Sequence, residues 1–182
     1  MKTLISAALF MALLLSAVPN LSNAQALTQA VSFNLAPLTE SFSAPLSEEK
    51  SGEKASTSAI SEKALKDFGR TFKNVHNQTW YKVPSGGYIA NFLSEGIDYR
   101  IGYNQRGNWR YNLLTYTEDH LPFEIRDLVK SQYYDYNIFV CFEYQCLEGK
   151  AYIIKMEDAT SYKTVTVFDG EIVSVEDLIK SK

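Results

Sequence analysis

Residues 102–111 read GYNQRGNWRY, and residues 165–174 read VTVFDGEIVS. Each stretch joins an alternating apolar run to a second run through a polar turn that contains one glycine. A period of two predicts strands with one buried face, and a short glycine turn between two such strands predicts a β-hairpin. A phosphate-binding loop would need several glycines that lead into a helix, whereas these glycines lead into strands. The two stretches therefore predict architecture and not a ligand loop.

The chain before the first hairpin predicts one helix and then strands. Ser61 can cap a helix whose apolar residues recur at spacings of three and four, namely Leu65, Phe68, Phe72 and Val75. After this helix the period changes to two, with a short strand at 79–83 and the turn PSGG at 84–87. Further alternating runs begin at Tyr88, Ile97 and Trp109. The pattern is typical of a helix followed by a four-stranded antiparallel meander.

The same order of elements starts again before the second hairpin. Pro122 stands near the start of a second amphipathic segment, LPFEIRDLVKSQY. Alternating runs follow at IFVCFEY, AYIIKM, YKTVTVF and EIVSV. We therefore predict an α+β domain at 61–182 made of two tandem α-β4 repeats, at 61–117 and 120–178, with both helices packed on one face of an antiparallel sheet.

The N-terminal residues predict export. Lys2, an apolar run at 4–18 and the small residues 22–24 have the order of a secretory signal peptide, so we expect cleavage after residue 24. The apolar run of about 15 residues is shorter than the roughly 20 that span a bilayer. Residues 25–60 are rich in Ser, Ala and Glu and predict a flexible linker, with one apolar patch at 31–38. The expected location is the periplasm or the cell exterior.

The charge pattern argues against nucleic acid as a partner. The formal net charge is −3, and basic and acidic residues are interspersed without a basic block. Phosphate backbones require a concentrated basic surface. No second long apolar stretch follows the signal, so we do not expect a membrane-spanning segment.

Cys141 and Cys146 are the two cysteines of the chain. In an exported protein they could form a disulfide. They are five residues apart, so in one continuous strand they would point to opposite faces, and a bridge would need a tight turn between them. The sequence leaves open whether they are bridged, and it favours two separate thiols.

No catalytic constellation stands out in the sequence. His76 and His120 lie among polar residues beside the two predicted helices, and Cys141 lies in a predicted strand without the helix N-terminus that would activate a thiol. The acidic pairs at 118–119 and 157–158 are neighbours in sequence and point apart. We therefore predict a protein that is not an enzyme and that uses neither a cofactor nor a metal ion.

The residues resemble a family of small exported bacterial proteins. The resemblance to PepSY-like proteins, whose fold is compared with the β-lactamase-inhibitor protein, spans about residues 64–175. Its markers are Trp80, Gly87-Tyr88, Phe92, Tyr103, Gly107, Trp109 and Leu121-Pro122. The resemblance implies helices on one face of an antiparallel sheet in two related halves, and it implies no catalytic residues. Relatives in the wider group resemble inhibitors or regulators of secreted enzymes, but the inhibitory loops of the β-lactamase inhibitor are not recognisable here.

The sheet face away from the helices is the predicted binding surface. The period of two assigns most of seven aromatic residues to the core, namely Trp80, Tyr88, Phe92, Tyr99, Tyr103, Trp109 and Tyr111. The opposite face would carry polar residues and tyrosines, and we expect Tyr81, Arg100, Arg110 and Asn112 to contact a protein partner. Tyr116 would lie on that same face. The alternative hypothesis is a small-ligand or glycan-binding protein that uses exposed aromatic side chains.

Overall fold

The computed structural model describes residues 52–84 and 86–181 of the chain. This part contains two α-helices, two 3-10 helices and nine strands. The expected signal peptide at 1–24 and the expected linker up to residue 51 lie outside the described residues. In chain order the elements are β1 (Glu53–Lys54), η2 (Thr57–Ala59), α2 (Glu62–Thr71), β2 (Thr79–Lys82), β3 (Tyr88–Ser94), β4 (Ile97–Tyr103), β5 (Trp109–Tyr116), η3 (Glu118–His120), α3 (Phe123–Gln132), β6 (Asn137–Cys146), β7 (Gly149–Glu157), β8 (Ser161–Phe168) and β9 (Glu171–Ile179).

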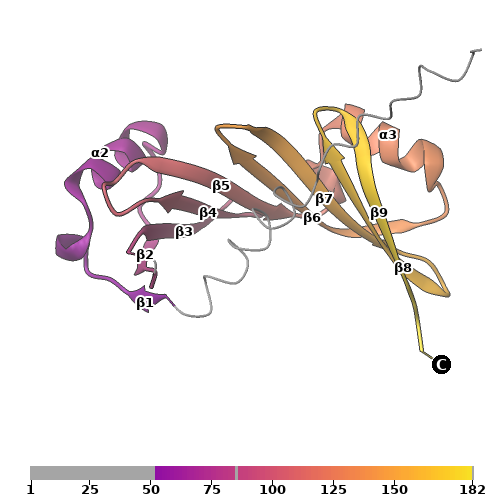
Figure 1. Cartoon of the computed structure of the whole chain (residues 1–182), viewed down its shortest axis with the longest axis horizontal. Helices are drawn as coiled ribbons and strands as arrows, with labels where there is room; N and C mark the ends of the chain where they lie inside the picture. The colour runs from indigo at the N-terminus through magenta and orange to yellow at the C-terminus, as the bar shows by residue number, and fades with distance from the viewer. Residues whose placement is uncertain (1–51, 85, 182) are drawn as a thin grey trace, which may run out of the picture. The chain divides into compact units, whose positions relative to one another are not determined.

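All nine strands form one antiparallel sheet, and their order in the sheet is their order in the chain (Figure 1). The pairing of β5 with β6 is in register from Tyr111 opposite Cys146 to Tyr116 opposite Cys141. Because of this pairing, the strands that follow α2 and the strands that follow α3 share one hydrogen-bonded ladder. The α+β fold with an antiparallel sheet agrees with the sequence prediction.

The folded unit extends further toward the N-terminus than the sequence predicted. The expected flexible linker ended at residue 60, but residues 52–60 take part in the fold. Glu53 pairs with Lys82, the Ala55 amide donates a hydrogen bond to the Trp80 carbonyl at 2.9 Å, and the Ile60 side chain is buried. A strand of two exposed residues has no hydrophobic period to detect, because its position depends on the free edge of β2.

Helix α2 buries one apolar stripe against the strands that follow it. Ala64 and Phe68 are buried, and the Phe68 ring lies 5.4 Å from the Trp80 ring and 5.6 Å from the Phe92 ring between centroids. These edge-to-face arrangements are the ones that aromatic quadrupoles favour. The predicted helical stripe is therefore the surface that holds α2 on the sheet.

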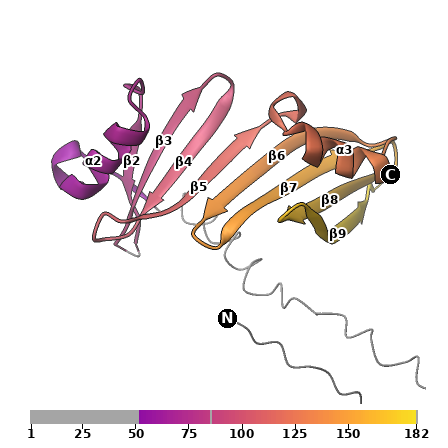
Figure 2. The same ribbon diagram turned by 90° about the horizontal axis from the view of Figure 1, so that it is seen from above.

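Helix α3 packs on the second half of the sheet in the same way (Figure 2). Its buried residues, Ile125 and Val129, belong to an apolar cluster that includes Cys141, Ile154 and Val165. Side chains directly opposite each other in an antiparallel pair share a face. One row of such partners joins the residues beneath α2 to those beneath α3, namely Phe92, Tyr99, Leu114, Glu143, Tyr152 and Val167. Both helices therefore pack on one face, which we call the helix face.

The two glycine hairpins differ in construction. Asp169 and Gly170 alone connect β8 to β9, and both have positive φ (50° and 80°), as a two-residue turn of type I′ requires. Residues 104–108 connect β4 to β5 in a longer loop, in which Gly107 has a φ of 74°. The Asn104 side chain organises this loop, because its Oδ1 accepts hydrogen bonds from the backbone amides of Arg106 and Asn108, both at 3.0 Å.

Candidate functional site on the opposite face of the sheet

The second face of the sheet, which we call the opposite face, carries a separate apolar cluster. Within residues 52–84 and 86–181, neither α-helix packs on this face. Leu113, Tyr144 and Ala151 lie opposite one another on β5, β6 and β7, and only 2%, 7% and 1% of their surfaces are exposed. Partly buried residues surround them: Tyr111, Phe142, Cys146, Ile153 and Phe168. The sheet thus has an apolar centre on both of its faces.

Two tyrosine rings stack at this cluster, one from its centre and one from the residues around it. The rings of Tyr111 and Tyr144 stack with centroids 5.6 Å apart and an angle of 24° between their planes. Gly102, the cross-strand partner of Tyr111, makes room for this arrangement, since a Cβ atom at position 102 would lie 2.3 Å from the Tyr111 ring. The glycine in β4 is therefore a packing partner of the aromatic side chain across the strand.

Charged residues lie beside the apolar cluster. Arg100, which is opposite Leu113, forms an ion pair with Asp98 at 3.6 Å, and 19% of the arginine side chain is exposed. The Lys155 amine lies 5.7 Å from the centre of the Phe142 ring, within the range of a cation–π interaction. Aromatic and arginine side chains around an apolar centre are the composition that energetically important protein interfaces favour.

The structure brings two of the four predicted contact residues onto this face. Tyr81 is opposite Ile89 and Arg100 is opposite Asn91, and both side chains are partly buried on the opposite face. Arg110 is exposed beside the turn between β6 and β7. There, after the hydrogen bond from Cys146, its charge helps to hold the pKa of the Glu148 carboxyl below its usual range.

The prediction for Asn112 was wrong about the face. Asn112 pairs with Ile101 on the helix face, where its Oδ1 accepts a hydrogen bond of 2.7 Å from the indole nitrogen of Trp109. The cause is a β-bulge: Gly102 pairs with Tyr111, but Tyr103 pairs with Trp109, so Arg110 is an extra residue in β5. Such an insertion shifts the alternation of all later residues by one.

The same bulge moves two tyrosines relative to the prediction. Tyr111, expected in the core beneath the helices, lies on the opposite face, and Tyr116, expected on the opposite face, is 4% exposed in the cluster beneath α3. The other aromatic predictions agree with the structure. Trp80, Phe92 and Tyr103 are buried beneath α2, and Tyr88, Tyr99 and Trp109 pack partly against them.

The two cysteines are unbridged and lie on opposite faces of β6. Burial, together with the nearby carboxylates of Glu118 and Asp119, raises the pKa of the Cys141 thiol to about 12. A thiol with this pKa remains protonated at neutral pH and is a poor nucleophile. Cys141 is therefore a packing residue of the helix face.

A hydrogen-bonded network of polar side chains lies on the helix face. The Tyr116 hydroxyl donates a hydrogen bond of 2.9 Å to Glu143, and Lys150 forms an ion pair of 2.6 Å with the same carboxylate. Burial and the charge of Glu143 raise the pKa of Tyr116, so its phenol stays a hydrogen-bond donor.

No cluster of three or more His, Cys, Asp and Glu side chains suited to a metal ion occurs among the described residues. None of the helices in that same part of the chain is long and apolar enough to cross a bilayer.

Four solved structures with a similar fold come from Bacteroides species. A DUF2874 family protein from Bacteroides ovatus ATCC 8483 superimposes with a TM-score of 0.54 at 16% identity, over 65% of this chain and 87% of that one. A BLIP-like protein from Bacteroides fragilis NCTC 9343, where BLIP denotes the β-lactamase-inhibitor protein, gives 0.53 at 13% identity, over 68% and 89%. The likeness is one of fold.

A third neighbour carries a provisional location in its name. This protein of Bacteroides eggerthii DSM 20697, provisionally described as periplasmic, gives a TM-score of 0.52 at 14% identity, over 65% of this chain and 88% of that one. The BLIP-like part of the predicted resemblance is thus supported by the fold. No family model and no curated protein matches the sequence.

Proposed function

We propose that this chain is an exported, non-catalytic module that binds a protein partner through the opposite face of its sheet. The observation that carries the proposal is the group of partly exposed apolar residues, Phe142 and Ile153 among them, that surrounds the buried cluster of Leu113, Tyr144 and Ala151 on the face where no described helix packs. Export rests on the signal-like residues 1–24, and the provisional periplasmic description of one neighbour is consistent with it. The location would be the periplasm or the cell exterior.

The proposal also covers the family of the chain and its internal repeat. We infer that the chain is a PepSY-like relative of the β-lactamase-inhibitor fold and that residues 61–117 and 120–178 are tandem α-β4 repeats. The element order supports this, because α2 and α3 are each followed by four strands and each packs on the helix face. The role that we propose for the chain, by analogy with that group, is to regulate or inhibit a secreted enzyme.

The partner contacts that we propose lie around the cluster. Tyr81 and Arg100 remain from the sequence prediction, and Phe142 and Ile153 join them as partly exposed apolar residues on the same face. Arg110 would contribute from the bulge at the edge of this surface. The fitting partner presents an apolar surface with hydrogen-bonding groups that meet the tyrosine and arginine side chains.

Site-specific photocrosslinking tests the proposal in the full-length chain expressed in its native host. p-Benzoyl-phenylalanine replaces Phe142 in one variant and Phe123, which is 72% exposed on α3, in the matched control. We expect a discrete adduct with one protein from position 142 and none from position 123. Adducts from position 123 alone, or from neither position, would contradict the proposal.

Affinity measurements with the purified cross-linked partner complete the test. Phe142→Ser should weaken binding at least about tenfold, the loss expected at an interface hot spot. Phe123→Ser should leave the Kd unchanged. Equal affinities for both variants, with unchanged melting temperatures, would show that the partner does not use the opposite face.

A further inference from the structure

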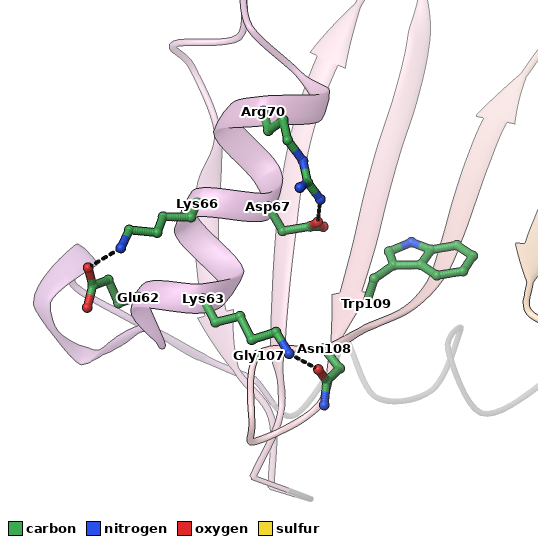
Figure 3. A pocket seen from close by; sticks show the side chains of 8 residues that line it. All are labelled: Glu62, Lys63, Lys66, Asp67, Arg70, Gly107, Asn108 and Trp109. Carbon is green, nitrogen blue, oxygen red and sulfur yellow. Dashed lines mark hydrogen bonds and ion pairs between the residues drawn. The ribbon is translucent and has the colours of Figure 1, made fainter.

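A pocket with a volume of about 620 Å³ lies between α2 and the hairpin that joins β4 to β5 (Figure 3). Ligand pockets in proteins have volumes of about 300–1,000 Å³. The lining consists of one aromatic residue, five charged residues, a glycine and an amide: Trp109, Glu62, Lys63, Lys66, Asp67, Arg70, Gly107 and Asn108. This mixture is unlike the apolar cluster on the opposite face, and its role is independent of the protein partner proposed above.

The aromatic wall of the pocket has a fixed orientation. The Trp109 indole nitrogen donates its hydrogen bond to Asn112 at 2.7 Å, so the N–H is not available to a ligand. Part of the ring packs against the aromatic cluster beneath α2, and the side chain is partly exposed in the pocket. The indole therefore offers a ligand its carbon surface, which is electron-rich on its faces.

The hairpin wall is held tightly against the helix. A Cβ atom at Gly107 would lie 2.4 Å from the Ser61 hydroxyl and 2.9 Å from the Ala64 amide nitrogen, so the loop approaches the first turn of α2 as only glycine allows. Lys63 also donates a hydrogen bond to the Asn108 side chain across the gap. The pocket is therefore already formed in the free protein.

The polar groups in the pocket can both donate and accept. Asp67 accepts hydrogen bonds from Arg70 at 2.7 Å and from the Tyr103 hydroxyl at 3.3 Å. Each oxygen of a carboxylate has a second lone pair, so Asp67 can also accept from a ligand, while the lysines and the arginine can donate to it. A sugar fits these groups, because each of its hydroxyls can both donate and accept a hydrogen bond.

The charges in the pocket favour an acidic ligand. Its three cationic side chains exceed its two carboxylates by one. Lys66 pairs with Glu62 at 2.7 Å and Arg70 pairs with Asp67, whereas Lys63 contacts the neutral amide of Asn108 and has no carboxylate partner among the described residues. Lys63 can therefore meet the carboxylate of a ligand without first losing an ion pair.

We infer that this pocket binds an acidic sugar residue, a pyranose that carries a carboxylate. The apolar C–H face of the ring would stack on Trp109, the ring hydroxyls would bond to Asp67 and Arg70, and the carboxylate would reach Lys63. A neutral sugar would lack the charge-assisted hydrogen bond to Lys63, and an aromatic acid would lack the hydroxyls that can donate further hydrogen bonds to Asp67.

The test titrates the purified protein with the α-1,4-linked trisaccharide of galacturonic acid and, as the neutral counterpart, with the α-1,4-linked trisaccharide of galactose. Binding is followed by calorimetry and by tryptophan fluorescence. Trp80 is 4% exposed in the core, so a ligand-dependent change should come from Trp109 and disappear in Trp109→Phe. The acidic trisaccharide should bind at least about tenfold more tightly than the neutral one, since a hydrogen bond to a charged group carries the difference.

Lys63→Gln isolates the charge without disturbing the core, because Lys63 is exposed. This variant should lose the preference for the acidic trisaccharide, whereas Lys73→Gln, an exposed lysine outside the pocket, should keep it. The inference is overturned if neither sugar binds at millimolar concentration, if both bind equally well, or if binding is unchanged in Lys63→Gln. Thermal melting of each variant confirms that the fold is retained.

Discussion

At the scale of single residues, the opposite face depends on the pair of Gly102 and Tyr111. The absent side chain of the glycine leaves space for the tyrosine ring, which stacks on Tyr144. Sequence alternation alone placed Tyr111 beneath the helices, because nothing in GYNQRGNWRY marks Arg110 as the extra residue of a bulge. The insertion becomes visible only when β4 and β5 are paired, since it is a property of two strands and not of one.

Two glycine-to-alanine substitutions should change stability in opposite directions. Gly102→Ala should lower the free energy of unfolding by about 1–3 kcal/mol, because the new methyl group collides with the Tyr111 ring. Gly69→Ala, at an exposed position of α2 with no atom within 4 Å, should raise it by up to about 1 kcal/mol. Urea denaturation of the two variants measures both changes.

A second substitution isolates the collision. Adding Tyr111→Ala to Gly102→Ala should make the glycine substitution nearly neutral, so the double-mutant cycle should show coupling of the two positions. Additive effects would mean that Gly102 is needed for the backbone of β4 and not for the tyrosine ring.

At the scale of elements, the helices are the part of the fold that the sequence predicted best. The stripe of Leu65, Phe68 and Phe72 determines which side of α2 meets the sheet, and local periodicity is sufficient to identify such a stripe. The sequence also predicted the Asp-Gly turn between β8 and β9, because a type I′ turn needs positive φ values and these residue types adopt them readily. The sequence did not predict β1, because its two polar residues show no alternation of apolar and polar side chains.

Phe68 should be the most sensitive position of α2. Its ring contacts the rings of Phe72, Trp80 and Phe92 with centroids 5.0–5.6 Å apart. Phe68→Ala should lower the free energy of unfolding by about 3–5 kcal/mol, because it leaves a cavity among these rings. The matched control Phe123→Ala removes a ring that is 72% exposed, so its effect should stay within about 0.5 kcal/mol.

Chemical denaturation of both variants measures the difference. A loss below about 1 kcal/mol for Phe68→Ala would mean that α2 contributes little to the stability of the sheet. A large loss for Phe123→Ala would show that the exposed end of α3 has contacts beyond those within residues 52–84 and 86–181.

At the scale of the whole molecule, the sequence predicted the class of the fold better than the candidate site. Tyr81 and Arg100 lie on the predicted face, but its apolar centre was missed because the bulge places Tyr111 on that face and not beneath the helices. The pocket beside Trp109 was also missed, since it forms where a hairpin tip meets a helix that starts more than 40 residues earlier in the chain. Contacts of this kind have no local pattern.

Alkaline pH should destabilise the described domain. Burial raises the pKa of Cys141 and of Tyr144 to about 12, and it raises the pKa of Tyr116 as well. In the unfolded chain a thiol titrates near 8.5 and a phenol near 10. Between these values and about pH 12 the unfolded state binds fewer protons than the folded state, so stability is intact below about pH 8 and falls as the pH rises.

The size of the effect can be assigned to individual groups. Each such group should lower the free energy of unfolding by up to about 1.4 kcal/mol per pH unit within its window. Urea denaturation between pH 8 and 11 measures the slope, and Cys141→Ala should remove the part that begins near pH 8.5. A stability that does not change up to pH 11 would contradict the buried environments of these groups.

The order of the strands has a consequence for folding kinetics. Every strand within residues 52–84 and 86–181 pairs with the strand next to it in the chain. Pairing these strands therefore does not require two segments that are distant in sequence to meet. The entropic cost of closing a loop grows with its length, and here the longest connection between paired strands is the one that contains η3 and α3. Each hairpin can form and recruit its neighbour, so the nine strands can assemble outward from any of several starting points, faster than a sheet of the same size with crossed connections.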